Sequence, residues 1–119
     1  MDNIHNEIKA MTNCAVAALL LGVFVAGAQA SDDAPVTVTI RAHRFEPPEL
    51  QIPSGQKLQL VIDNQDATAE EFESHSLHRE KIIPANSRAI VYIGPLKPGR
   101  YEFYGEFNEA TARGVVIAK

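Results

Sequence analysis

Four side chains that can bind a metal ion fall within eight residues of this chain: Glu71, Glu73, His75 and His78. If the segment is extended, Glu71, Glu73 and His75 share one face, and Phe72 points the other way, into a core. If the segment is a helical turn, Glu71, His75 and His78 share a face instead. Because Glu71 and His75 are on the same face in either conformation, they are the first candidates for a metal site.

The donor atoms available to such a site are oxygen and nitrogen. The one cysteine, Cys14, and both methionines, Met1 and Met11, precede residue 31, in a segment that we expect to be removed. A blue-copper centre requires a cysteine thiolate among its ligands. Carboxylate and imidazole groups together suit iron, Cu(II), manganese or zinc. The sequence therefore predicts an ion of iron, copper, manganese or zinc that is bound without sulfur.

Residues 1–30 have the pattern of a secretory signal peptide. Lys9 precedes an uncharged apolar run at 14–27, and small residues flank a glutamine at 28–30. The apolar run has 14 residues, whereas a membrane span usually requires roughly 20, so cleavage is favoured over a permanent anchor. We expect a mature chain that begins at Ser31 in the periplasm and is not inserted in the membrane after processing.

Residues 31–119 are long enough for one domain and are mildly acidic. The whole chain has 11 Lys and Arg and 15 Asp and Glu; residues 1–30 hold one basic and two acidic residues, which leaves ten and thirteen, a net charge of −3. A nucleic-acid-binding protein would have a basic face, so that class is excluded. With no cysteine after residue 30, the core must come from sheet packing and not from disulfides.

The same residues have the pattern of an all-β domain. Short segments alternate apolar and polar side chains, and Pro and Gly turn signals separate them. The expected strands are 36–40, 50–52, 57–62, 89–93, 101–104 and 115–118. Strands of this length and number indicate a β-sandwich. The segment 65–84 lacks clean alternation and is expected to be a long loop with at most one helical turn.

Several of these segments resemble the cupredoxin family. Residues 44–56 (RFEPPELQIPSGQ) are similar to its F-x-P … I-x-V-x-x-G opening, 60–64 (LVIDN) to its third strand, and 96–104 (LKPGRYEFY) to the run before its cysteine. Residues 70–81 (EEFESHSLHREK) resemble a run in the periplasmic cupredoxin-like proteins associated with bacterial ferrous-iron uptake. The resemblance implies a cupredoxin-like Greek-key β-sandwich over 31–119.

The resemblance also implies that the blue-copper ligands have been replaced. The positions of the first histidine, the cysteine, the second histidine and the methionine correspond to Glu70 or Glu71, Tyr104 or Gly105, Phe107 or Asn108, and Ala112. Glu106, in the loop that replaces the cysteine loop, can approach the same end of the sandwich. The predicted metal ligands are therefore Glu71, Glu73, His75, His78 and Glu106.

Other polar and aromatic side chains have ordinary structural explanations. Glu70 is part of an acidic run and is expected on a solvated face. Glu80 lies between Arg79 and Lys81 and is expected to form ion pairs with them. His43 is expected to be a surface or capping residue. The side chains expected in the core are Phe45, Phe72, Phe103 and Phe107.

Three functions from different classes fit this sequence. The first is a periplasmic metal-binding accessory protein of iron or copper uptake, which would act with an inner-membrane iron permease and a second periplasmic metal protein. The second is a copper-dependent ferroxidase, which requires a redox-active metal with an open coordination position. A small domain without cysteine is less suited to be such an enzyme alone. The third is a metal-free interaction module on a cupredoxin scaffold, because a fold does not specify a function.

Overall fold

The computed structural model describes residues 35–119, so the predicted signal peptide lies outside the described residues. The elements are β1 (Val36–Arg41), β2 (Arg44–Glu46), β3 (Glu49–Ile52), β4 (Leu58–Asn64), β5 (Glu70–Ser74), β6 (Arg79–Ile83), β7 (Ser87–Ile93), β8 (Gly99–Gly105), the 3-10 turn η1 (Glu106–Asn108) and β9 (Arg113–Ala118). Within this part of the chain, no helix is long and apolar enough to cross a membrane.

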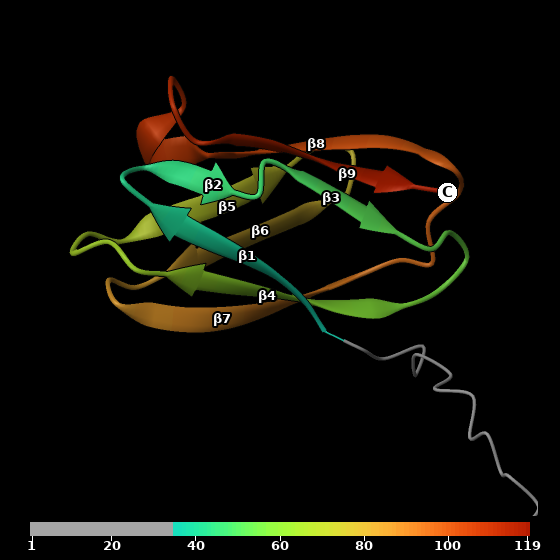
Figure 1. Cartoon of the computed structure of the whole chain (residues 1–119), viewed down its shortest axis with the longest axis horizontal. Helices are drawn as coiled ribbons and strands as arrows, with labels where there is room; N and C mark the ends of the chain where they lie inside the picture. Colours follow the sequence, from blue (N-terminus) through green and yellow to red (C-terminus); the bar gives the residue numbers. More distant parts are fainter. Residues whose placement is uncertain (1–34) are drawn as a thin grey trace, which may run out of the picture.

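The strands form two sheets that pack face to face, as Figure 1 shows. One sheet has the order β2-β1-β4-β7 and the other the order β3-β9-β8-β5-β6. The pairs β1–β4 and β3–β9 are parallel, and the remaining pairs are antiparallel. Because the chain passes repeatedly from one sheet to the other, the domain is an all-β sandwich, as the sequence predicts.

The inward side chains of both sheets form one core. Along β4, Leu60 and Ile62 are fully buried and alternate with partly exposed residues. The rings of Phe45, Phe72 and Phe103 meet between the sheets at centroid distances of 4.9 to 6.3 Å. Aromatic pairs at such distances stabilise a core beyond the area that they bury. These three phenylalanines are core residues, as expected.

The six segments expected to be strands are strands in the structure, but the expectation of a loop over 65–84 is wrong. This segment contains the hairpin of β5 and β6. The inward positions of β5 are Glu70, Phe72 and Ser74, all of them buried. Two of the three are polar, so β5 lacks the apolar alternation by which a strand is recognised in a sequence. Of the two alternatives for the predicted metal-binding segment, the extended one is correct up to Ser74.

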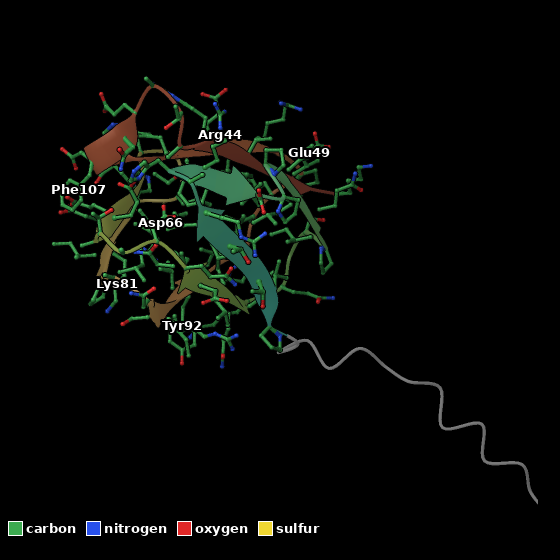
Figure 2. All side chains as sticks on the ribbon, turned by 60° about the vertical axis from the view of Figure 1, so that its left-hand side comes forward. Arg44, Glu49, Asp66, Lys81, Tyr92 and Phe107 are labelled. Carbon is green, nitrogen blue, oxygen red and sulfur yellow. The ribbon has the colours of Figure 1, made fainter. Side chains whose placement is uncertain are left out.

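Phe107 is the exception among the phenylalanines expected in the core. Its side chain is 52% exposed, and Figure 2 shows it at the surface of the domain. The inward positions of β8 are Phe103 and Gly105, and the strand ends at Gly105. Because η1 begins at the next residue, the two-residue alternation does not continue to Phe107.

Candidate metal centre

β5 places Glu71 and Glu73 on the outer face of the five-stranded sheet. Phe72, between them, is fully buried, so the strand's alternation turns the two carboxylates away from the core. Strand β5 pairs with β8 on one side and with β6 on the other. The residues directly across from Glu73 are Tyr104 on β8 and Glu80 on β6.

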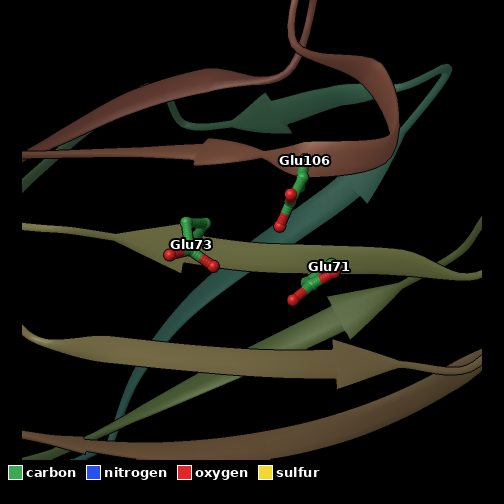
Figure 3. Close-up of side chains that lie close together, drawn as sticks. All are labelled: Glu71, Glu73 and Glu106. Carbon is green, nitrogen blue, oxygen red and sulfur yellow. The ribbon is translucent and has the colours of Figure 1, made fainter.

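The turn η1 brings a third carboxylate to this face. Glu106 follows β8 directly, and Figure 3 shows it pointing toward Glu71 and Glu73. One carboxylate oxygen of each of the three residues lies within 4.8 Å of the others. Oxygen ligands lie at roughly 2.0–2.6 Å from Mg²⁺ or Ca²⁺, so two ligands of one ion are at most about 5 Å apart. The three carboxylates are therefore close enough to share one cation.

Glu71 is the member of this cluster whose ionised form is least favoured. Its side chain is only 8% exposed. A hydrogen bond with the carboxyl group of Glu80, burial, and the charges of Glu106, Glu80 and Glu73 raise the pKa of Glu71 to about 7. Within residues 35–119, no basic side chain forms an ion pair with it. A bound cation would favour the ionised form of Glu71 and offset the repulsion.

The two predicted histidine ligands lie outside this cluster. Residues 75–78 form the turn between β5 and β6, which Figure 1 shows at the far end of the hairpin from η1. His75 and Glu71 are four positions apart along an extended chain, a separation of about 13 Å, because a strand rises about 3.3 Å per residue. A shared face therefore does not bring them to one ion. Nε2 of His75 lies 3.1 Å from the hydroxyl of Tyr104 instead, and His78 has a φ of 54° within the turn.

Glu80 and Tyr104 border the cluster, and sequence reasoning assigned neither of them to the metal site. Glu80 forms no ion pair with its basic neighbours within the described residues, because alternation along β6 turns those neighbours to the other side of the strand. Its carboxyl group instead contributes to the raised pKa of Glu71. Burial and the charges of Glu73 and other acidic residues raise the pKa of Tyr104, so it is a neutral phenol at pH 7. The only signal that could identify both residues is their pairing with Glu73.

The expectation that Glu70 lies on a solvated face is wrong. Its side chain is 1% exposed, because it points between the sheets at the end where η1 lies. Oε1 accepts hydrogen bonds from the backbone N–H of Phe107 at 2.9 Å and from that of Glu71 at 3.0 Å. Oε2 accepts a hydrogen bond from Nδ2 of Asn108 at 2.6 Å. These three donors satisfy the buried carboxylate.

The positions that correspond to blue-copper ligands meet around this buried carboxylate. A Cβ placed on Gly105 would lie 2.6 Å from Cδ of Glu70 and 2.7 Å from Cβ of Ala112. Asn108 closes the remaining side through its hydrogen bond. The four residues provide neither thiolate nor imidazole, and they leave no space at Gly105 for a larger side chain. They do not fit a type 1 copper ion.

His43 lies at the surface, as expected. Its backbone N–H donates to the carboxylate of Asp66 at 2.9 Å, and the N–H of Ala42 donates to the other oxygen of that carboxylate at 2.8 Å. Nδ1 of His43 lies 3.5 Å from the same group. Asp66 therefore caps the turn between β1 and β2, and the contacts of His43 are explained by this turn.

A family model and a protein of another organism match the sequence of this chain. A family model described as a cupredoxin-like domain matches residues 14–118. An uncharacterized protein of Rickettsia prowazekii is 46% identical over 82 residues, which cover 69% of this chain and 66% of that protein, just under two thirds of its length.

Two solved structures illustrate the likeness of the fold. Amicyanin from Paracoccus versutus has a TM-score of 0.58 at 16% identity, covering 71% of this chain and 81% of that one. The metal-binding domain of a Cu(I)-exporting P-type ATPase of Streptococcus pneumoniae, solved with Cu(I), has a TM-score of 0.60 at 13% identity, covering 71% and 84%. The family match, which spans most of the sequence, and the sandwich topology agree: this chain belongs to the cupredoxin-like domain family.

Proposed function

We propose that this chain is a periplasmic metal-binding accessory protein of iron uptake, with its ion bound by Glu71, Glu73 and Glu106 on the outer face of the sandwich. The observation that carries the proposal is the environment of Glu71. Its carboxyl group is buried among other carboxyl groups and has no basic partner within the described residues. Like charges at such distances oppose ionisation. A cation supplies the missing positive charge.

The type of donor supports iron over copper as the bound ion. Cu(I) prefers thiolate and thioether ligands, and imidazole is a common ligand of Cu(II). The cluster offers neither, because its three members are all carboxylates. Carboxylate-rich sites hold iron in the di-iron carboxylate proteins. The resemblance of residues 70–81 to a run found in proteins of ferrous-iron uptake supports the same ion.

The position of the cluster supports a role in transfer of the ion. Glu106 is exposed and Glu73 is partly exposed, so one side of the cluster faces solvent. Three protein ligands leave open coordination positions, through which a second ligand can take over the ion. An inner-membrane iron permease and a second periplasmic metal protein are the proposed partners in that exchange.

Titration calorimetry of the exported protein with Fe(II) under anaerobic conditions tests the proposal, with Mn(II) as a probe that is stable in air. Glu71→Gln and Glu106→Gln should each weaken binding about tenfold or more, since each removes a charged ligand. Glu102→Gln is the matched control, because Glu102 lies on the outer face of β8 and outside the cluster. A wild-type protein that binds neither ion would refute the proposal and favour the metal-free interaction module.

A further inference from the structure

We propose that the buried Glu70 is a positioning residue that sets the distance between Glu71 and Glu106 in the metal centre. The inference rests on the proposed function and concerns a side chain that faces the interior, away from the ion. Its carboxylate joins strand β5, which carries Glu71 and Glu73, to the turn η1, which carries Glu106. Glu70 would thus act on the ion through its neighbours.

The bridge is made by a single oxygen atom. Oε1 of Glu70 accepts hydrogen bonds from the backbone N–H of Glu71 and from that of Phe107. The first N–H belongs to a proposed ligand, and the second belongs to the residue that follows Glu106. The shared acceptor therefore holds the two backbone segments at a fixed separation.

The second oxygen extends the connection to the rest of the loop. Oε2 accepts a hydrogen bond from the side chain of Asn108 at 2.6 Å. The backbone carbonyl of Asn108 accepts from the N–H groups of Thr111 and Ala112, at 3.1 and 2.8 Å. The N–H of Gly105 in turn donates to the carbonyl of Ala112 at 2.9 Å. The buried carboxylate of Glu70 thereby anchors this loop, whose other hydrogen bonds are mainly internal.

No other hydrogen bond between β5 and η1 duplicates this connection within residues 35–119. The backbone pairing of β5 with β8 reaches Phe72 and Gly105 and goes no further toward η1. The close packing of Gly105 and Ala112 keeps the Glu70 carboxylate in place. Residues behind the ligands of a metal site commonly control its affinity in this way.

A fixed ligand separation has a consequence for selectivity. Discrimination between cations of different size depends on cavity size and on the rigidity of the ligands. If Glu70 fixes the Glu71–Glu106 separation, removal of its carboxylate should weaken binding of the preferred ion. It should also reduce the difference in affinity between that ion and cations of other sizes. A purely structural role would lower stability without changing this difference.

Three variants separate the contributions of the two oxygens. Asn108→Ala removes only the contact to Oε2, and Glu70→Ala removes the whole bridge. Glu70→Gln is the conservative variant, because its amide oxygen can still accept both backbone N–H groups, and its amide nitrogen can donate to Asn108 after that side chain rotates. Mn(II) affinity should fall about 10- to 100-fold in Glu70→Ala. It should fall by a smaller factor in Asn108→Ala, where the bridge through Oε1 remains. Glu70→Gln should retain affinity within about threefold.

Asn64→Ala is the matched control for a loss of buried hydrogen bonds. Asn64 is 1% exposed and donates to the carbonyls of Thr68, Ile83 and Pro84, close to the same end of the sandwich. It contacts none of the proposed ligands. Asn64→Ala should lower the free energy of unfolding while Mn(II) affinity and the ratio of Mn(II) to Ca(II) affinity stay at the wild-type values.

The experiment is a calorimetric titration of the exported wild-type protein and these variants with Mn(II) and with Ca(II), together with amide hydrogen exchange at Phe107. Exchange at Phe107 should accelerate in Glu70→Ala even without metal, because its acceptor is gone. Suppose that the wild type and Glu102→Gln bind Mn(II) and that Glu71→Gln binds it at least about tenfold more weakly. If Asn108→Ala and Glu70→Ala then bind like the wild type, with an unchanged ratio of Mn(II) to Ca(II) affinity, the positioning role is overturned and the proposed function stands. If the wild type binds no ion, both are overturned. Because Asn108→Ala removes one contact only, it tests the inference even if Glu70→Ala does not fold.

Discussion

Replacing Gly105 by alanine probes the closed end of the sandwich, where a cupredoxin metal site would otherwise lie. Gly105 has φ −92° and ψ 111°, a conformation that alanine adopts freely. At such a position, Gly→Ala alone stabilises a protein by about 0.4–1 kcal/mol through the unfolded state. Any loss of stability must therefore come from the space around the new methyl group.

That space is already filled. The added Cβ would lie 2.6 Å from Cδ and 2.8 Å from Oε1 of Glu70, and 2.7 Å from Cβ of Ala112. Overpacking of a core costs about 1–3 kcal/mol, and displacement of Glu70 adds the loss of hydrogen bonds to a charged group, about 1.5–3 kcal/mol each. We expect Gly105→Ala to lower the free energy of unfolding by at least about 2 kcal/mol. For a domain of this size, the corresponding fall in Tm is about 8–16 °C.

Urea unfolding of the metal-free protein, followed by circular dichroism, measures this loss. The double variant with Glu70→Ala provides a thermodynamic cycle, because removing the carboxylate relieves two of the three close contacts. The two changes should couple by about 1 kcal/mol or more. A Gly105→Ala protein within about 0.5 kcal/mol of wild type would show that Glu70 moves aside easily, and the reasoning about a rigid, closed end would be wrong.

Three further predictions concern pH, copper and processing. Without metal, the free energy of unfolding should decrease as pH rises from 4.5 to 7, because the folded protein keeps the proton of Glu71 to about pH 7 and the unfolded chain releases it near 4.5. Glu71→Gln should reduce this slope, and equal slopes in denaturant titrations would contradict the assignment. Exported protein incubated with Cu(II) should show no intense blue absorption band, because no thiolate follows residue 30; such a band would disprove the ligand assignment. N-terminal sequencing of the exported protein should begin at Ser31, and an intact Met1 would rule out cleavage.

Strand β5 shows why a sequence pattern can fail to identify a strand. Strands such as β1 and β4 were predictable because their inward positions are apolar and their alternation is visible. In β5 the inward Glu70 and Ser74 are polar, and they are buried because other parts of the chain supply their partners. Those partners lie beyond residue 100, so no local window of sequence reveals the strand.

Some features of the candidate site could likewise be predicted from the sequence, and others could not. The residue types, carboxylates without sulfur, and the outward direction of Glu71 and Glu73 follow from composition and from a two-residue alternation. The exclusion of His75 from the cluster also follows from the rise of a strand, once the segment is known to be extended. The expectation for Glu80 was wrong because the register of β5 on β6 sets this residue across from Glu73, among other carboxyl groups, and its neighbours in sequence do not decide its surroundings.

By itself, the sequence determined the all-β class, most strand positions and the absence of sulfur ligands after residue 30, because alternation, turn residues and composition are local properties. Only the tertiary structure decided that carboxylate oxygens of Glu71, Glu73 and Glu106 lie close together, and that Glu70 turns inward to accept the backbone N–H of Phe107. These contacts depend on the pairing of β5 with β8 and on the end of β8 at Gly105. Contacts between residues far apart in the chain arise from the packing of the whole sandwich, and short-range patterns do not encode them.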